Sequence, residues 1–302
     1  MSSLMKFALF GSMFPDRSLK TVEQTIGVCE TLKKYPTSLY VSEGFFRTLP
    51  ADAQQHIGTL CDLFDTQFPE VDMAISVGGD GTYLRTAVAV GSSGVPVLGI
   101  NTGRLGFLAA VNHADAAETI REVMQGVYRI EHRTLLKMNA KGNVEPIGHN
   151  AHALNEIAIM KQDTASMLYI HAYINNDYLT SYQADGLVIA TPTGSTAYSL
   201  SVGGSILAPT TPSLILSAIA PHSFTSRPLV VDDNCLISLK VKSRSNTFLV
   251  SLDGQSQVFD QAVEINIRKA DYTLQVVKRA GHSFFETLRD KLKWGEDVRR
   301  IY

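Results

Sequence analysis

The sequence predicts a two-domain protein, with an α/β domain built on a doubly wound parallel sheet, a β-rich domain after it, and a terminal helix. Apolar strands without alternation, separated by helical stretches, fill the first third of the chain and indicate a parallel sheet covered on both faces. Residues 130–277 are mostly segments that alternate or are rich in β-branched and aromatic residues, which favour β-strands. A length of 302 residues also favours two domains.

The first domain alternates strands and helices. The apolar run 72–77 stops at Gly78 and Gly79, because glycine accommodates the unusual backbone of a turn after a buried strand. In chain order we expect a strand at 6–10, a helix at 18–34, a strand at 38–42, a helix at 51–64, a strand at 72–77, a helix at 82–90 and a strand at 95–100.

The pattern changes after residue 110, where we place the domain boundary. A helix is expected over 112–125, with Asn112 as a candidate N-cap and Gly126 as its stop. Farther on, Asn175–Asn176 separates two strand-like segments and predicts a tight hairpin turn, since Asn tolerates positive φ.

A charged amphipathic helix is expected over 283–300, because its apolar residues fall on one side. These residues are Phe284, Phe285, Leu288 and Leu292. We expect this helix to return to the first domain. The predicted domains are therefore 1–110, with 278–302 packing back, and 111–277.

Composition excludes several classes of protein. Lys and Arg (27) nearly balance Asp and Glu (29), for a formal net charge of −2, so no basic surface indicates nucleic-acid or anionic-membrane binding. No apolar run reaches the length of about 18 residues that would span a bilayer. Three scattered cysteines without a CxxC pair argue against a zinc site or a disulfide framework and favour a reducing interior. We therefore expect a cytoplasmic protein without a metal site of its own.

The first candidate site is Gly78-Gly79-Asp80-Gly81-Thr82, between a buried strand and a helix. Glycines let the backbone approach a ligand closely, and the first turn of the helix offers free N–H groups to a phosphate. Asp80 could there accept a proton or hold a metal. The alternative is a plain strand-to-helix turn with Asp80 as the N-cap. No Gly-Lys-Ser/Thr follows, so the motif is not a P-loop.

The second candidate runs from Asp185 through ATPTGSTAYS to Gly204. A strand at 187–190 leads into a hydroxyl-rich turn, where Thr193, Ser195 and Thr196 can cap a helix and donate to phosphate or ribose oxygens. A tight turn with a capped helix does not account for six hydroxyl residues among the nine from 193 to 201. We therefore favour a binding segment.

The third candidate is Asn155-Glu156, inside an otherwise apolar strand. Adjacent strand residues point to opposite faces, so one of the two faces inward and needs polar partners. A bound ribose or base would supply them. A structural Asn at a strand edge would give the same pattern.

Together with NTGRLGFL (101–108), these motifs resemble the ATP-NAD kinase family in order and spacing, over roughly residues 73–255. GGDGT is shared with lipid kinases and phosphofructokinases, whereas TPTGSTAYS with an upstream Asp-Gly is much more specific. The resemblance implies a Rossmann-like α/β domain, then a β-sandwich-like domain, with the C-terminal segment returning to the first. It also implies transfer of a phosphoryl group from ATP to the 2′-hydroxyl of the adenosine ribose of NAD, which makes NADP.

The resemblance implies residue roles as well. Asp80 matches the catalytic aspartate, which takes the proton of the 2′-hydroxyl and also binds NAD, and Arg85 is expected near the phosphates. Asp185 is expected near the nicotinamide half, Tyr198 against a ring, and Ala220 at a backbone contact. The further residues expected to bind the dinucleotide are Gly81, Asn155, Glu156, Thr193, Thr196, Ala197, Ser199, Leu200, Ser201 and Gln255. One departure is Gln183, where some members of the family carry Arg.

The substrates implied are ATP and NAD, with a divalent cation, Mg²⁺, bound mainly through ATP. A homodimer or homotetramer is implied too. Two other classes stay open: a lipid kinase, although the chain has no amphipathic membrane-binding stretch, and a dinucleotide sensor without turnover, which Asp80 opposes. Asp80 could also be a metal ligand rather than a base.

Overall fold

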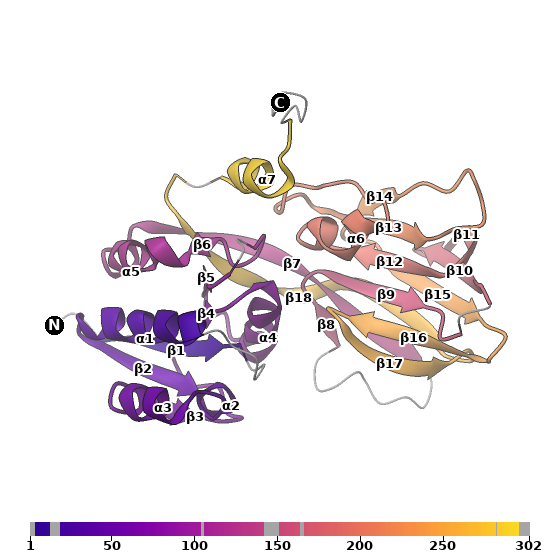
Figure 1. Cartoon of the computed structure of the whole chain (residues 1–302). Helices are drawn as coiled ribbons and strands as arrows, with labels where there is room; N and C mark the ends of the chain where they lie inside the picture. Colours follow the sequence, from indigo (N-terminus) through magenta and orange to yellow (C-terminus); the bar gives the residue numbers. More distant parts are fainter. Residues whose placement is uncertain are drawn as a thin grey trace, which may run out of the picture. The chain divides into compact units, whose positions relative to one another are not determined.

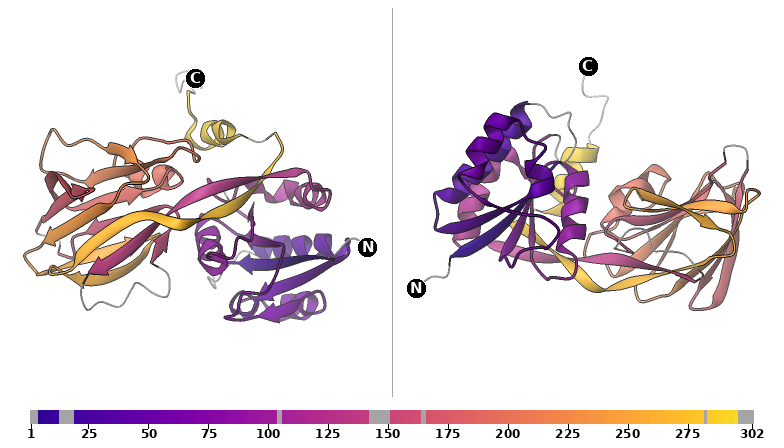
Figure 2. Two further views of the ribbon diagram at one scale, coloured as in Figure 1. Left: turned by 180° about the vertical axis from the view of Figure 1, so that it is seen from behind. Right: turned by 90° about the horizontal axis from the view of Figure 1, so that it is seen from below.

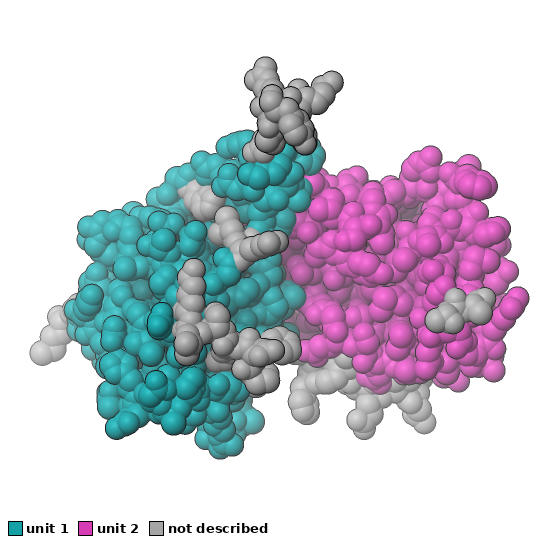
Figure 3. Space-filling view, in the orientation of Figure 1, with its two compact units in different colours: residues 1–131, 274–302 teal, residues 132–273 magenta. Residues whose placement is uncertain are grey.

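The computed structural model describes residues 4–12, 19–103, 106–141, 151–163, 166–281 and 283–295. The chain forms two compact units, 1–131 with 274–302 (unit 1) and 132–273 (unit 2), shown in two colours in Figure 3. It passes between them in two long strands, β7 (Tyr128–Lys141) and β18 (Glu264–Arg279). These strands pair with each other and run side by side in Figures 1 and 2.

Unit 1 is an α/β layer structure on a parallel sheet of order β3-β2-β1-β4-β5, extended at β5 by β6 and by Val276 of β18. The apolar central strands are buried on both sides, so Phe7, Leu9 and Ile75 are almost fully buried against helical residues such as Leu32. Its elements are β1 Met5–Gly11, α1 Leu19–Lys33, β2 Thr37–Ser42, α2 Glu43–Phe46, α3 Ala51–Gly58, β3 Asp62–Phe64, β4 Met73–Val77, α4 Asp80–Val90, β5 Val97–Asn101, β6 Val111–Asn112, α5 Ala116–Met124 and α7 Phe284–Leu292.

The predicted helix over 51–64 is wrong in its last part. Helix α3 ends at Gly58, and β3 follows as a parallel edge strand beside β2. This pairing satisfies the outer backbone groups of β2 and places the Phe64 ring edge-on against Phe10, with ring centroids 5.4 Å apart. The tertiary pairing therefore overrides a polar, helix-like local sequence.

Helix α5 begins later than predicted, because a short 3₁₀ turn, His113–Asp115, precedes it. Asn112 caps that turn by accepting a hydrogen bond from the Ala114 amide, and Gly126 follows the helix with φ 73°, as a helix stop requires. The buried side of α5, which includes Ile120, belongs to the core of unit 1. The compact units accordingly divide after residue 131, whereas the sequence places the boundary after 110.

Helix α7 is shorter than predicted. Ser283 and Glu286 form a capping box at its start, and Lys293, in the left-handed region at φ 53°, ends it. Leu288 is buried, but Phe285 is 61% exposed, so the four apolar residues do not form one covered face. Residues 296–300 of the predicted helix lie outside the described residues.

Unit 2 is a sandwich of two sheets. One has the order β11-β10-β15-β18, with β7 and β8 paired beyond β18, and the other has the order β14-β13-β12-β9-β16-β17. The core contains residues of both sheets, among them Ile159 and Ile189 of the second and Ile170 and Ile265 of the first. The remaining strands are β8 His152–Ala153, β9 Glu156–Met160, β10 Leu168–Ile174, β11 Asp177–Ala184, β12 Gly186–Ala190, β13 Ser213–Ile219, β14 Leu229–Asp232, β15 Ile237–Lys242, β16 Thr247–Leu252 and β17 Gln255–Asp260.

The predicted hairpin turn is confirmed. Asn175 and Asn176 both have positive φ (51° and 71°), and they join β10 to β11 with Ile174 opposite Asp177. The predicted fold class, an α/β domain followed by a β-sandwich-like domain, is confirmed as well.

Candidate active site

Asp80 is the first residue of α4, at the carboxyl end of the buried strand β4. Gly79 is the N-cap, so the alternative that Asp80 caps the helix is wrong. The Asp80 carboxylate instead accepts hydrogen bonds from three successive amides, those of Phe107 (2.9 Å), Leu108 (3.2 Å) and Ala109 (3.1 Å). The two glycine-rich motifs of the first domain therefore meet at one carboxylate.

The loop after β5 is shaped to receive that carboxylate. Asn101, which is buried, accepts the Gly103 amide on Oδ1 at 2.7 Å and so starts the turn. A Cβ on Gly106 would overlap Asp80 Oδ1, so glycine is needed there if the carboxylate is to keep this position. Arg104 and Leu105 lie outside the described residues.

Arg85 lies on α4, where its guanidinium donates from Nη2 to Thr82 Oγ1 at 3.3 Å. Partial burial lowers the pKa of Arg85, because burial disfavours the charged form. Gly81 is exposed in the first turn of the same helix, and a Cβ there would meet open space. Asp80, Gly81 and Arg85 thus share one helix.

In unit 2, Asn155 and Glu156 stand at the start of β9. Asn155 is buried, and its carbonyl accepts the Thr191 amide at 2.9 Å. Burial, and then the nearby Asp253 carboxylate, raise the pKa of Glu156 to about 7, while a hydrogen bond from the Tyr198 amide lowers it. Glu156 is therefore poised between its two charge states near neutral pH.

The hydroxyl-rich segment follows β12 as a 3₁₀ turn, Gly194–Thr196, and a short helix α6, Tyr198–Ser201. The prediction that Thr193, Ser195 and Thr196 cap a helix is wrong, since neither element has a side-chain cap. The reason is that all three hydroxyls have other partners: Thr193 accepts from Arg133, whereas Ser195 and Thr196 donate to carbonyls of the turn. Ser195 donates to Pro192 O (2.7 Å) and accepts from the Leu207 amide (3.0 Å).

Burial divides the predicted binding residues of this segment into two groups. Thr193 and Ser199 are buried. Thr193 Oγ1 accepts a hydrogen bond from Arg133 Nη1 at 3.2 Å, and Ser199 Oγ lies 3.5 Å from Ser217 Oγ. The residues with accessible surface are Thr196, Ala197, Tyr198, Leu200 and Ser201. A ligand beside this segment would meet the second group.

Asp185 lies between β11 and β12 and forms an ion pair with Lys161, with Nζ and Oδ1 2.7 Å apart. Its amide donates to the Ile219 carbonyl, next to Ala220. Ala220 has φ 43°, an uncommon conformation for a residue with a side chain. Gln255, at the start of β17, is exposed.

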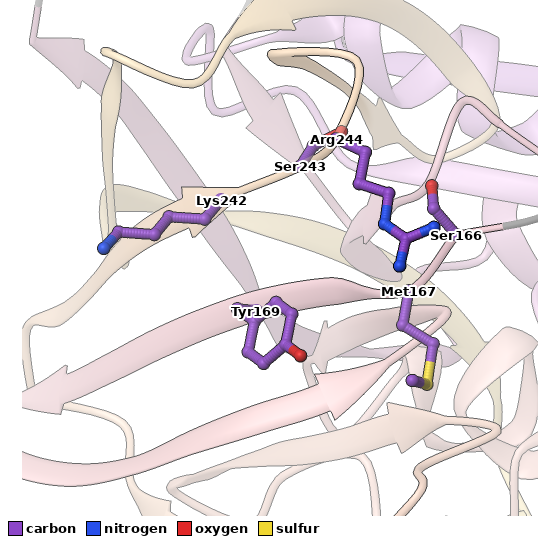
Figure 4. A pocket seen from close by; sticks show the side chains of 6 residues that line it. All are labelled: Ser166, Met167, Tyr169, Lys242, Ser243 and Arg244. Atoms are coloured by element: carbon purple, nitrogen blue, oxygen red, sulfur yellow. The ribbon is translucent and has the colours of Figure 1, made fainter.

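The described residues of unit 2 line at least two cavities. One, of about 410 Å³, is lined by Gln183, by Pro221 next to Ala220, and by Arg227 among others. The second, of about 280 Å³, is lined by Ser166, Met167, Tyr169, Lys242, Ser243 and Arg244. Figure 4 shows the Arg244 guanidinium beside Ser166, whereas the Lys242 ammonium points away from it. No predicted site residue lines this second cavity.

Comparison with known proteins decides the family. The ATP-NAD kinase N-terminal domain matches residues 20–128, and the ATP-NAD kinase C-terminal domain matches residues 154–279. The chain belongs to the ATP-NAD kinase family.

Relatives in this family match nearly the whole chain. The NAD kinase of Bacteroides fragilis (strain ATCC 25285) is 46% identical over 295 residues, which are 98% of this chain and all of the relative. The NAD kinase of Porphyromonas gingivalis (strain W83) is 43% identical over 296 residues, with the same coverage of both chains.

Solved structures agree. A yeast NADH kinase complexed with NADH has a TM-score of 0.86 at 25% identity, over 99% of this chain and 90% of that one. An NAD kinase from Archaeoglobus fulgidus in complex with ATP has a TM-score of 0.74 at 24% identity, over 96% of this chain and 99% of that one, which shows the shared fold.

Within this ATP-NAD kinase fold, two residues that the sequence did not single out support the predicted site. Asp253 binds the backbone of Asn155 and Glu156, and Arg133 binds Thr193. Among the described residues, no three Asp, Glu, His or Cys side chains are grouped to hold a metal ion. No described helix is long and apolar enough to cross a membrane.

Proposed function

We propose that this chain transfers the γ-phosphoryl group of ATP to the 2′-hydroxyl of the adenosine ribose of NAD, with Asp80 as the proton acceptor. Membership of the ATP-NAD kinase family makes it an ATP-dependent enzyme that phosphorylates NAD. The observation that carries the role of Asp80 is its place at the carboxyl end of β4, where ligands bind in open α/β sheets.

Asp80 supplies the base in this proposal. A carboxylate that accepts three amide hydrogen bonds is held in one orientation, which favours general-base catalysis of a fixed hydroxyl. Such assistance is worth about 10²–10⁴-fold in rate. In-line positioning of the two substrates would supply much of the remaining acceleration.

The phosphates of ATP need local positive charge, because a net charge of −2 gives no attractive field over the whole protein. The N-terminus of α4 offers free amides, and Arg85 on the same helix offers a guanidinium. The divalent cation, Mg²⁺ in this proposal, arrives with ATP and neutralises its β- and γ-phosphates. The family resemblance supports the same assignment.

The dinucleotide is held mainly by unit 2 in this proposal. Asn155 and Glu156 bind ribose hydroxyls or the base, Asp185 lies toward the nicotinamide half, and the Ala220 backbone makes a further contact. Tyr198 packs against a ring. The additional binding residues proposed are Gly81, Thr193, Thr196, Ala197, Ser199, Leu200, Ser201 and Gln255. Burial of Thr193 and Ser199 favours a supporting role for these two hydroxyls.

A coupled assay tests the proposed function. The protein is incubated with ATP, Mg²⁺ and NAD, and NADP is measured with an NADP-specific dehydrogenase, with NADH as a second acceptor. Steady formation of NADP is expected. Tight binding of NAD or NADH without product would indicate a sensor, and phosphorylation of a lipid instead would indicate a lipid kinase.

The role of Asp80 as a base, rather than a metal ligand, is tested by the pH–rate profile in Mg²⁺ and in Mn²⁺. A base gives the same acid limb with both metals. A limb that moves with the metal would indicate that Asp80 is a metal ligand.

We further propose that the protein is a cytoplasmic homodimer or homotetramer. Light scattering at several protein concentrations would measure its oligomeric state.

Gly106→Ala is expected to lower kcat by roughly 10–100-fold while the protein stays folded, because the new Cβ would occupy the place of Asp80 Oδ1 and displace the carboxylate. NADP formation and the thermal unfolding temperature are the measurements. Gly103→Ala in the same loop is the matched control, since a Cβ there meets only Asn101 Oδ1 at 3.9 Å. Equal kcat in both variants would contradict the proposed coupling of loop and carboxylate.

A further inference from the structure

Asp253 occupies the turn between β16 and β17, in the Asp-Gly sequence typical of a tight hairpin. Asp253 (φ 48°) and Gly254 (φ 87°) are both left-handed, as such a turn requires. The turn alone would leave the carboxylate in solvent. Instead it faces the start of β9 and accepts the amides of Leu154 (2.7 Å), Asn155 (2.9 Å) and Glu156 (3.1 Å).

The same segment is held from a second side. Thr191 donates its hydroxyl to the Leu154 carbonyl at 2.6 Å and its amide to the Asn155 carbonyl at 2.9 Å. The Asp253 amide also donates to the Glu156 carbonyl at 3.2 Å. Three successive residues, Leu154 to Glu156, therefore have their backbone fixed, and with it the directions of the Asn155 and Glu156 side chains.

Asp253 also sets the electrostatic environment of Glu156. The groups that act on the Glu156 carboxyl are the Asp253 carboxylate from the β16–β17 turn and the Tyr198 amide from α6. Burial raises the pKa of Glu156 most, and repulsion from Asp253 raises it further. Burial also raises the pKa of Asp253, which its three amide donors lower. A negative Asp253 thus favours a protonated Glu156, which can donate a hydrogen bond.

We propose that Asp253 is a positioning residue of the NAD site: its carboxylate fixes the backbone of Asn155 and Glu156, and with it the directions of their side chains, without itself touching NAD. This rests on the proposed function, in which Asn155 and Glu156 bind NAD. In this inference, Asp253 affects NAD binding through Asn155 and Glu156.

Asp253→Asn in the full chain tests the inference. If Oδ1 is kept as the acceptor, the hydrogen bonds from Asn155 and Glu156 remain, while the Leu154 bond and the negative charge are lost. We expect KM for NAD to rise roughly tenfold, with kcat and KM for ATP within about threefold of the parent enzyme.

The pH profile separates this from a purely structural effect. Removing a negative neighbour makes ionisation of Glu156 easier, so its pKa falls. We expect an inflection from Glu156 near pH 7 in kcat/KM for NAD in the parent enzyme, and at lower pH in Asp253→Asn. An unchanged KM together with an unchanged inflection would overturn the inference.

Asp260→Asn is the matched control, because Asp260 also accepts a backbone amide (Ala262, 2.8 Å) at the other end of β17 but is exposed. It should leave KM and the pH profile unchanged. If Asp253→Asn does not fold, ¹³C NMR titration of Glu156 in the parent protein, assigned with Glu156→Gln, decides the electrostatic part. An inflection near pH 7 supports it, and one at the ordinary value of about 4.3 overturns it.

Calorimetry of NAD binding to the parent and to Asp253→Asn distinguishes a failure of the proposed function from a failure of the inference about Asp253. If the parent protein makes no NADP, the proposed function is wrong, yet a tenfold weaker binding by the variant would still support the positioning role. If the parent is active and both proteins bind NAD equally, only the inference about Asp253 is wrong.

Discussion

Asp80→Asn is expected to lower kcat by about 10²–10⁴-fold, equivalent to about 3–5 kcal/mol of barrier, while KM for NAD stays within a few fold. An amide can still accept from part of the 106–109 loop, but it cannot take the proton of the ribose hydroxyl. NADP formation under saturating ATP and Mg²⁺ measures the loss, and circular dichroism checks that the fold is kept.

Asp72→Asn is the control for that substitution. Asp72 is another carboxylate of unit 1 that accepts a backbone amide, from Lys6 at 2.7 Å, and it lies outside the GGDG turn. It should retain full turnover. Turnover near that of the parent in Asp80→Asn would remove Asp80 from the chemical step, although the carboxylate could still have a structural role.

Gly194→Ala is expected to destabilise the protein by about 1–3 kcal/mol and to raise KM for NAD. A Cβ on Gly194 would overlap the carbonyl oxygen of Asn155, and both partners are backbone, so the hydroxyl-rich turn and the start of β9 must move apart. Thermal unfolding gives the change in stability, and NADP formation at varied NAD gives KM.

Gly27→Ala provides the contrast. Gly27 lies within α1, where a Cβ meets nothing within 4 Å, so the exchange should stabilise the helix by about 0.5–1 kcal/mol. The opposite signs of the two Gly→Ala effects are the expected result. A Gly194→Ala protein as stable as the parent, with unchanged KM, would show that the close contact is not required.

Local sequence patterns predicted turns, which are stabilised by their own residues, and strands that are buried along their whole length. The apolar run 72–77 could only be a buried strand, and Asn175–Asn176 could form the turn with positive φ at little cost. The edge strand β3 could not be predicted, because Leu63 and Phe64 become a strand only when β2 is beside them. Propensity in residues 51–64 therefore gave the wrong answer at its end.

The candidate site shows the same division. Gly78-Gly79-Asp80 was recognisable because glycines and a carboxylate follow an apolar strand, and Asn155-Glu156 because two polar residues interrupt one. The partners of these residues were not recognisable. Asp253 is 97 residues from Glu156 in sequence and resembles an ordinary turn aspartate, and the amides that bind Asp80 carry no side-chain signal. Hydrogen bonds between distant segments leave no trace in local pattern.

Unit 1 is discontinuous in sequence, which has a consequence for biosynthesis. Val276, which pairs with Val97, and Arg279, which holds Glu122 at 2.8 Å, leave the ribosome only after residues 132–273. All of unit 2 has by then been translated. Since domains fold as units during synthesis, the second unit can reach its native state before the first has all its strands. Residues 1–131 therefore remain an incomplete folding unit until residues 274–279 have been made.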